Sequence, residues 1–429
     1  MEEKDIASGA RAALVSVVTR ERTEEEVQAS LEELRRLLET AGGTAAFTFV
    51  QNKETPDVRT YIGSGKAVEL CYYCAQNEVT LAVFDCELTP SQIRNLEEVL
   101  GDVRVIDRSM LILDIFALHA VSGEGKLQVE LAQLKYTAPR LMGRGTELSR
   151  LGGGIGTRGP GESQLETDRR HLQRRVRMLE RSLEELAAGR RTQRQARDRS
   201  GLPRIAIVGY TNAGKSTLLN YLTDAGILAR DQLFATLDPT TRKCQLPGGE
   251  TVLLTDTVGF IRNLPHHLIH AFRSTLEEAV YADLLLVVVD ASDTEAVAQL
   301  QVTEELLQSL GAGGKPTLYV FNKCDLGAAH PGMSHGKEHV AYISAATGQG
   351  VDMMMQKIED ILHAGKRRVT FLIPNAKQGL LNKLYENATV ENVEYGAEGV
   401  LVTAVVDAKT YGPLRDFDTV PRVEENEDE

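Results

Sequence analysis

The sequence predicts a multidomain α/β protein, and three patterns along its 429 residues lead to that fold class. Apolar runs alternate with helical patterns up to about residue 107, which is typical of a small α/β domain with a mainly parallel sheet. Two leucine-rich helical stretches flank a glycine-rich loop, which predicts an antiparallel helical hairpin. A second alternation, from residue 202 to residue 363, predicts another domain with a mostly parallel sheet, followed by a small α+β unit.

The chain is too long for one hydrophobic core, so several domains are expected. We place an N-terminal α/β domain at residues 1–107, a helical hairpin at 108–192, a linker at 193–201, a second α/β domain at 202–363, a C-terminal α+β domain at 364–420 and an acidic tail at 421–429. In the first domain we expect strands at 14–18, 44–50, 79–84 and 103–106, and helices at 24–41, 66–76 and 89–100. In the C-terminal domain we expect a strand at 369–373, a helix at 376–387 and strands at 390–395 and 399–406.

The hairpin is predicted from the spacing of its apolar residues. Helical patterns cover residues 109–120 and 126–136, and a longer helix begins at the capping box of Ser163 and Glu166. That helix places apolar residues at alternating three- and four-residue steps: Leu165, Leu172, Val176, Leu179, Leu183 and Leu186. Such a heptad seam packs against a partner helix and leaves the arginines on the outer face. The loop of residues 152–161 holds six glycines, so it is either a plain linker or a tip that brings backbone N–H groups to a ligand.

The most informative motif lies between an apolar strand at 205–208 and a helical pattern. Its residues are Gly209, Tyr210, Thr211, Asn212, Ala213, Gly214, Lys215, Ser216 and Thr217. Glycines let the backbone curl so that N–H groups point at phosphate oxygens, and the helix N-terminus adds positive potential. Lys215 can reach the β- and γ-phosphates, and the Ser216 hydroxyl can bind Mg²⁺. This context predicts a P-loop nucleotide site.

A second motif indicates which base is bound. Directly after the apolar run at 317–321, where ligands bind at the carboxyl end of a parallel strand, come Asn322, Lys323, Cys324 and Asp325. The Asp325 carboxylate can accept two hydrogen bonds from guanine, an arrangement that adenine does not offer. A further polar turn after a strand, able to support the guanine O6 through backbone N–H groups, is formed by Ser344, Ala345 and Ala346. We therefore expect GTP or GDP rather than an adenine nucleotide.

The remaining elements of a GTPase domain lie in order between these motifs. The strand at 251–255 leads into Asp256, Thr257, Val258 and Gly259. The aspartate can hold Mg²⁺ through water, and the glycine N–H can meet the γ-phosphate. The segment expected to contact GTP upstream is Phe234, Ala235, Thr236, Leu237 and Asp238. We expect Ser216 and Thr236 as Mg²⁺ ligands, with Thr240 and Thr241 as alternatives to Thr236, and Lys215, Thr236 and Gly259 as the catalytic set.

One position departs from the best-known GTPase pattern. Many GTPases place Gln directly after this glycine to orient the attacking water, but here the residue is Phe260. A phenyl ring neither donates nor accepts that hydrogen bond, so intrinsic hydrolysis should be slow. Asn212 stands where some GTPases use Asn to hold K⁺ against the phosphates, and it could equally serve only to shape the loop.

Composition restricts the classes of protein to consider. The 42% hydrophobic and 25% charged fractions are ordinary for a soluble protein, and no apolar run is long enough to span a bilayer. The five cysteines form no regular framework, which indicates a reducing, cytoplasmic location; partial membrane association stays open. The CxxC pair Cys71 and Cys74 falls in a helical pattern, so we interpret it as core packing.

The formal net charge of −13 argues against nucleic acid, but its distribution does not. Residues 169–199 hold eleven arginines and four acidic residues, a local net charge of +7. A one-sided arginine stripe on an acidic protein indicates a polyanionic partner, although a solvated helix face is the alternative. The residues expected to contact RNA are Arg158, Arg169, Arg170, Arg174, Arg175 and Arg177.

The chain resembles the HflX family of ribosome-associated GTPases. Beyond the generic GTPase motifs, the resemblance rests on residues 61–66 (YIGSGK), 105–108 (VIDR), 127–134 (LQVELAQL) and 149–170. It implies binding to the large ribosomal subunit and its rRNA, with the hairpin and glycine loop directed toward the peptidyl-transferase region. We expect the chain to act as a monomer. It also implies splitting or rescue of stalled ribosomes under stress, and GTP hydrolysis stimulated by the ribosome. The hydrophobic Phe260 matches the family as well.

Two other functions fit parts of the same sequence. A ribosome-assembly GTPase would use the basic helical hairpin of residues 108–192, called the arm below, to chaperone immature large subunits. Preference for precursor over mature subunits would identify it. An RNA-remodelling NTPase would bind nucleotide in the N-terminal domain near Gly63 and Lys66, although that short loop lacks P-loop spacing. A membrane-trafficking GTPase needs a lipid anchor or amphipathic helix, and neither is visible.

Overall fold

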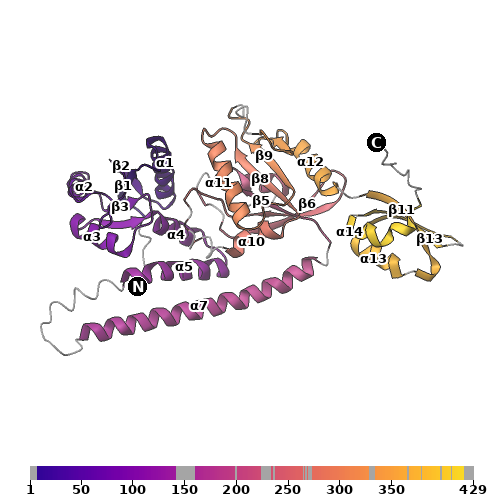
Figure 1. Ribbon diagram of the computed structural model, residues 1–429, viewed down its shortest axis with the longest axis horizontal. Helices are drawn as coiled ribbons and strands as arrows, with labels where there is room; N and C mark the ends of the chain where they lie inside the picture. Colours follow the sequence, from indigo (N-terminus) through magenta and orange to yellow (C-terminus); the bar gives the residue numbers. More distant parts are fainter. Residues whose placement is uncertain are drawn as a thin grey trace, which may run out of the picture.

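The computed structural model describes residues 7–141, 160–198, 201–223, 233–234, 237–263, 265, 268, 273–327, 334–364, 367–377, 379–396, 399–406 and 408–419. The described residues form three separate sheets, with the predicted mixture of α/β domains and a helical hairpin (Figure 1). In Figure 1 the long helix α7 runs beneath the N-terminal and central domains. Within the described ranges, no helix is both long and apolar enough to cross a bilayer.

The N-terminal domain is a parallel α/β sheet. Its strands, in spatial order β2-β1-β3-β4, are β1 (Arg11–Val18), β2 (Thr44–Asn52), β3 (Leu81–Phe84) and β4 (Arg104–Asp107). Its helices are α1 (Glu24–Thr40), α2 (Ser64–Gln76) and α3 (Pro90–Leu100). Capping boxes at Thr23 and Thr89 start α1 and α3, as a hydroxyl followed by Glu or Gln predicts. On α2, Cys74 is buried in the domain core and Cys71 is partly buried against it, as expected for packing.

Lys66, in the short loop considered for a second nucleotide, has local partners instead. Its ammonium pairs with Glu69 at 2.8 Å and lies 5.4 Å from the centre of the Phe49 ring. Gly63 donates its N–H to Gln51 at 2.8 Å. These contacts show that residues 63–66 form the start of α2.

The hairpin consists of α4 (Arg108–His119), α5 (Gly123–Leu141) and α7 (Pro160–Asp198). The predicted seam on α7 is only partly buried: Leu179 is fully enclosed against α5, whereas Leu186 is 40% exposed. The seam prediction is therefore wrong at Leu186, which stays exposed although Arg190, one turn further along α7, still pairs with Glu124 in the first turn of α5. The expected linker at 193–201 is also too long, since α7 continues to Asp198 through good helix formers. Most of the glycine loop and Arg158 lie outside the described residues.

The central domain has a six-stranded sheet in the order β10-β9-β8-β5-β7-β6. Its strands are β5 (Arg204–Gly209), β6 (Thr240–Gln245), β7 (Thr251–Asp256), β8 (Leu284–Asp290), β9 (Thr317–Asn322) and β10 (Val340–Tyr342). Only β6 pairs antiparallel, at the sheet edge. Its described helices include α8 (Lys215–Thr223), α10 (Arg273–Tyr281), α11 (Ala296–Ser309) and α12 (Val351–His363). The parallel strands bring the carboxyl ends of β5, β8 and β9 to one edge, where the site lies.

The C-terminal domain is a small antiparallel sheet with its own core, in the order β11-β13-β12. Its elements are β11 (Arg367–Pro374), η1 (Asn375–Lys377), α13 (Gly379–Asn387), β12 (Thr389–Tyr395), β13 (Gly399–Val406), α14 (Ala408–Tyr411) and η2 (Gly412–Phe417). These are the strands and the helix that the sequence predicts, and they lie away from the site (Figure 1).

Candidate nucleotide-binding site

The loop between β5 and α8 has the backbone that its glycines predict. Gly209 has φ +146°, and a Cβ there would lie 2.2 Å from the Val288 carbonyl oxygen. Gly214 has φ +94°, and a Cβ would lie 2.2 Å from the Asn322 side-chain amide. Both positions therefore exclude other residues. Asn212 is left-handed at φ +61°, a conformation that Asn tolerates well, so its backbone already accounts for a shaping role.

The Lys215 and Ser216 side chains, expected at the phosphates and at Mg²⁺, both have close partners in the structure. The buried Lys215 ammonium donates to the carbonyls of Gly209 at 3.2 Å and Tyr210 at 2.7 Å. Burial lowers the pKa of Lys215 to about 8, while Asp256 opposes the shift; a polyphosphate would raise the pKa again. Ser216 Oγ lies 2.6 Å from Asp256 Oδ2, so the hydroxyl and carboxylate suited to Mg²⁺ converge on one point.

Asn322 connects the phosphate loop to the base-recognition loops. Its amide Nδ2 donates to the Ala213 carbonyl at 2.9 Å, and its Oδ1 accepts from the Ala345 N–H at 2.9 Å. Lys323 is left-handed and pairs with Asp290 at 2.7 Å, which turns the chain after β9. Asp325 follows two residues later and is exposed. The sequence predicts the residues, but only the fold shows that Asn322 holds the three loops together.

The Ser344 turn is held by its own hydrogen bonds. Ser344 is buried and accepts the Thr347 N–H on its hydroxyl at 3.2 Å. Ala345 is buried, and Ala346 is exposed beside it. This turn lies against Asn322 and therefore next to the expected base site.

The segment after β7 lies directly on the phosphate loop. A Cβ at Gly259 would lie 2.7 Å from Thr211 Cα and 3.0 Å from the Lys215 ammonium, so glycine is required by close approach. Thr211 donates its N–H to the Phe260 carbonyl at 2.8 Å. The Phe260 side chain is 1% exposed and belongs to the core, so the ring packs and does not face solvent at the site. Thr257 donates its hydroxyl to the Ile207 carbonyl and acts as a structural residue.

Phe234, Leu237 and Asp238, from the upstream segment, dock on the hairpin. Phe234 is buried, donates its N–H to Thr211 Oγ1 at 2.8 Å and meets the Phe116 ring of α4 edge-on, with centroids 4.8 Å apart. Leu237 is buried in the same core. Ala235 and Thr236 lie outside the described residues. Of the alternatives to Thr236, Thr241 bonds Thr255 at 2.9 Å and Thr240 lies opposite Asp256 in the β6–β7 ladder.

Asp238 belongs to the hairpin more than to the phosphate loop. Its carboxylate accepts three hydrogen bonds at the start of α5: from the N–H groups of Val121 at 3.0 Å and Ser122 at 2.7 Å, and from the Ser122 hydroxyl at 2.5 Å. A Cβ at Gly125 would lie 2.6 Å from Asp238 Oδ1. An anion at a helix N-terminus is favourable, so this contact ties the GTPase segment to the arm.

A second contact between domains was not predicted. The Arg108 guanidinium, 2% exposed, binds Asp85 at 2.9 Å, Glu33 of α1, and the Arg262 carbonyl at 3.2 Å. Tyr210, within the phosphate loop, donates its hydroxyl to the same Glu33 and accepts the Arg262 N–H at 2.8 Å. Burial alone would lower the pKa of Arg108, but the neighbouring carboxylates outweigh it and raise the pKa. Arg108 belongs to the VIDR motif noted in the sequence. Its ion-pair partners could not be inferred, because they lie too far from it along the chain.

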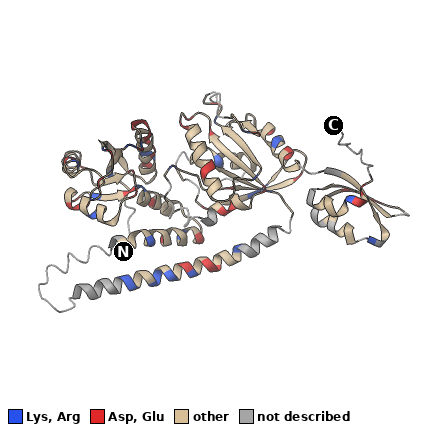
Figure 2. Cartoon of the chain, in the orientation of Figure 1, with Lys and Arg blue, Asp and Glu red and all other residues tan. Residues whose placement is uncertain are grey.

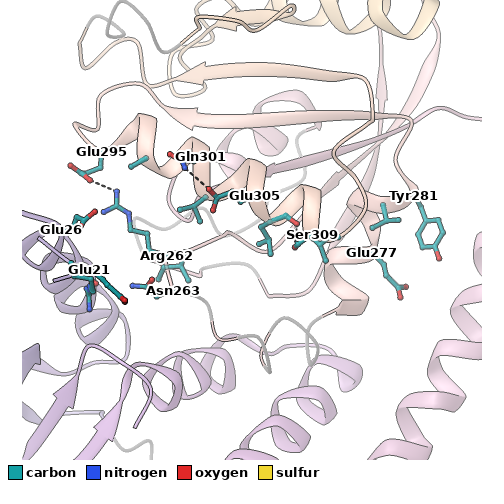
Figure 3. Close-up of a pocket in the computed structure, with 18 residues that line it drawn as sticks. Glu21, Glu26, Arg262, Asn263, Glu277, Tyr281, Glu295, Gln301, Glu305 and Ser309 are labelled. Atoms are coloured by element: carbon teal, nitrogen blue, oxygen red, sulfur yellow. Dashed lines mark hydrogen bonds and ion pairs between the residues drawn. The ribbon is translucent and has the colours of Figure 1, made fainter. Parts of the chain in front are cut away.

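Beside this contact lies a cleft of about 880 Å³ between the N-terminal domain and helices α10 and α11. Figure 3 shows Glu21 and Glu26 on one side, with Arg262 and Glu295 paired at 2.6 Å across from them. The polar rim and the paired arginine make the cleft a solvated boundary between the domains.

Two arginines of α7 pair with carboxylates of α5. Arg175 forms two hydrogen bonds with Glu130 of α5, at 2.6 and 2.7 Å, and Arg190 pairs with Glu124. Arg169, Arg174 and Arg177 are exposed and form no ion pair with the described residues. Figure 2 shows basic residues along α7 with acidic ones among them. The predicted arginine surface therefore exists, but Arg175 also holds the hairpin closed.

Comparison with protein families covers nearly the whole chain. Residues 28–117 match the GTP-binding GTPase N-terminal model, 119–197 the GTP-binding GTPase middle region, 204–323 the 50S ribosome-binding GTPase model and 332–409 the HflX C-terminal domain. The chain belongs to the HflX family of GTPases. A GTPase HflX of Lacrimispora saccharolytica is 49% identical over 95% of this chain and 96% of its own. GTPase HflX of Escherichia coli is 42% identical over 90% of each chain.

Solved structures are similar to this HflX chain as well. A GTP-binding protein of Sulfolobus solfataricus in complex with GDP is 28% identical, covers 82% of this chain and 99% of its own, and superposes with a TM-score of 0.44. The SsGBP and GDP complex gives 28% identity over the same shares and a TM-score of 0.47. The domain content and the family assignment rest on the sequence matches.

Proposed function

We propose that this HflX chain binds GTP, hydrolyses it and uses the nucleotide state to control association with the large ribosomal subunit. The observation that carries the proposal is that the segment of residues 234–238 contacts the arm at two places. Phe234 and Asp238 flank the expected γ-phosphate sensor, and both are held by the arm, at α4 and at the start of α5. A change at the phosphates therefore acts on the element expected to meet rRNA.

The residues around the phosphates have distinct roles in this proposal. Lys215 places a positive charge at the β- and γ-phosphates, and the Gly259 N–H donates to the γ-phosphate. Ser216 and Asp256, already 2.6 Å apart, fit Mg²⁺, with Thr236 completing the set. When bound, Mg²⁺ neutralises charge that develops on the phosphate oxygens. Asn212 is the candidate for contact with K⁺.

Specificity for guanine rests on Asp325, supported by Asn322. The carboxylate stands at the rim while the amide fixes the Ala213 and Ala345 loops on either side. A guanine in that position offers two N–H donors to the carboxylate, whereas an adenine leaves it unpaired.

Hydrolysis by the chain alone should be slow. Phe260 is packed in the core and supplies no group to orient water, and no Gln stands at that position. The reaction then depends on a group or a rearrangement supplied by the ribosome. This is consistent with a factor that acts on assembled or stalled ribosomes, where hydrolysis follows binding and releases the protein.

Co-sedimentation with purified ribosomal subunits tests the proposal. Large subunits should retain the protein with a non-hydrolysable GTP analogue and lose it with GDP. Equal retention in both nucleotide states would refute a nucleotide-controlled switch. Incubation of 70S ribosomes with the GTP form, followed by gradient separation, tests splitting, and precursor large subunits in parallel test the assembly function.

A further inference from the structure

The apolar seam between α5 and α7 opens into a pocket near the loop end of the hairpin. The pocket has a volume of about 340 Å³ and is lined by Ala138, Arg169, Leu172, Gln173, Val176 and Arg177. The five α7 residues repeat at three- and four-residue steps, so they share one helix face. That face turns toward α5, where Ala138 is the lining residue among the side chains that the structure describes.

On the α5 side, the pocket is lined by a small side chain. Further along the seam Leu179 is buried to 1% exposure, whereas Leu172 and Val176 remain half-buried. Ala138 carries a single methyl group and precedes Pro139, which lies inside α5 and has no N–H for the helix ladder. Apolar walls are therefore open to solvent in an arm that is otherwise strongly polar.

The rim of the pocket is cationic. Arg169 and Arg177 line it, and neither forms an ion pair with any described residue. Arg177 turns its Nε back to the Gln173 carbonyl at 3.2 Å, which holds the guanidinium over the rim. Gln173 adds one neutral amide that can donate and accept a hydrogen bond. The combination suits a flat apolar group carried on an anionic chain.

We propose that this pocket binds a single unstacked nucleobase of RNA while Arg169 and Arg177 contact the adjoining phosphates. This rests on the proposed function, in which the arm meets rRNA. Unpaired RNA bases are recognised by insertion between apolar or guanidinium surfaces, and by hydrogen bonds to their exposed edges. The volume lies at the lower end of ligand pockets and suits one heterocycle rather than a peptide or a duplex.

The pocket would give the arm a preference that arginine–phosphate contacts alone cannot supply. Phosphate contacts carry no sequence information, whereas an inserted base requires a loop, bulge or single strand. The arm should therefore favour RNA with an extruded base over a continuous duplex of equal charge.

The test uses the full chain and an oligoadenylate RNA of about 12 nucleotides with 2-aminopurine at its centre. Binding should raise 2-aminopurine fluorescence, because the base leaves its stacked neighbours. A second RNA with an abasic site at that position has the same number of phosphates. We expect it to bind at least about 5-fold more weakly, the loss typical of one inserted base.

Two variants localise the effect. Ala138→Phe fills the pocket without altering charge, and it should abolish the fluorescence change and bind the two RNAs equally. Ala188→Phe places the same side chain at an exposed position elsewhere on α7 and should behave as wild type. The wild-type comparison with abasic RNA does not depend on either variant folding.

Equal affinity of the wild type for the two RNAs, or an unchanged fluorescence response in Ala138→Phe, would overturn the base pocket. Co-sedimentation with large subunits, run on the same preparation, distinguishes failure of the base pocket from failure of the proposed function. Retention with equal RNA affinities refutes the pocket alone. Absence of retention in every nucleotide state refutes ribosome association itself.

Discussion

Replacing Gly125 by Ala should uncouple the GTPase segment from the arm. A methyl group at this position would lie 2.6 Å from Asp238 Oδ1, closer than a carbon and an oxygen can approach. The carboxylate would have to move, and it is held by three hydrogen bonds from Val121 and Ser122. Movement therefore releases Ser122, whose hydroxyl caps α5 by accepting the Gly125 N–H at 2.8 Å.

The magnitude follows from what the cap contributes. Loss of a helix N-cap costs about 0.5–2 kcal/mol, and hydrogen bonds to a charged group contribute about 1.5–3 kcal/mol each. Partial compensation by water leaves a net loss of about 2 kcal/mol at the first turn of α5. Local opening of that turn should become roughly 30-fold more frequent.

Amide hydrogen exchange at the first turn of α5 measures this directly, and it avoids a global free energy of unfolding in a multidomain chain. Asp238→Ala should give the same acceleration. Gly123→Ala is the matched control, because its Cβ would meet nothing within 4 Å and Ala favours a helix by about 0.5–1 kcal/mol. If Gly125→Ala and Gly123→Ala exchange alike, the Asp238 contact does not hold the arm and the argument fails.

Three further predictions concern the base, the water and the arm. Asp325→Asn should weaken GTP binding and favour xanthosine nucleotides, because an amide can donate to the extra carbonyl; unchanged GTP affinity in a titration would contradict the guanine assignment. Ser216→Ala should abolish Mg²⁺-dependent turnover in a phosphate-release assay, whereas Phe260→Leu should reduce turnover only modestly. Leu is chosen at Phe260 because truncation to Ala would leave a core cavity costing about 3–5 kcal/mol of stability. A collapse at Phe260→Leu with GTP binding intact would show that the ring organises catalysis. A variant with four arginines changed to Gln should bind large subunits more weakly and with a flatter salt dependence, since fewer counterions are released; an unchanged salt series would leave only a solvated helix face. The four positions are Arg169, Arg174, Arg177 and Arg181.

Much of the nucleotide site could be predicted because its determinants are local. Gly209 and Gly214 are required by their own backbone angles, Ser216 lies in the first turn of α8 and Asp256 ends β7. The arm was harder to predict, since a heptad pattern predicts that two helices pack together but not how many of the seam residues become buried. Leu186 is exposed despite its place in the seam, and Arg175, although exposed, pairs with Glu130 of α5.

The sequence by itself predicted the order of the domains, the expected phosphate and guanine loops and the family, because each depends on residues within a few positions of one another. Only the tertiary structure decided how those parts act on each other. Glu33 and Tyr210 lie 177 positions apart, and Ser122 and Asp238 lie 116 apart, yet each pair is hydrogen-bonded. Such contacts form when whole domains pack together, and no local pattern records which polar side chain will meet which. The link between nucleotide and arm is therefore a property of the fold.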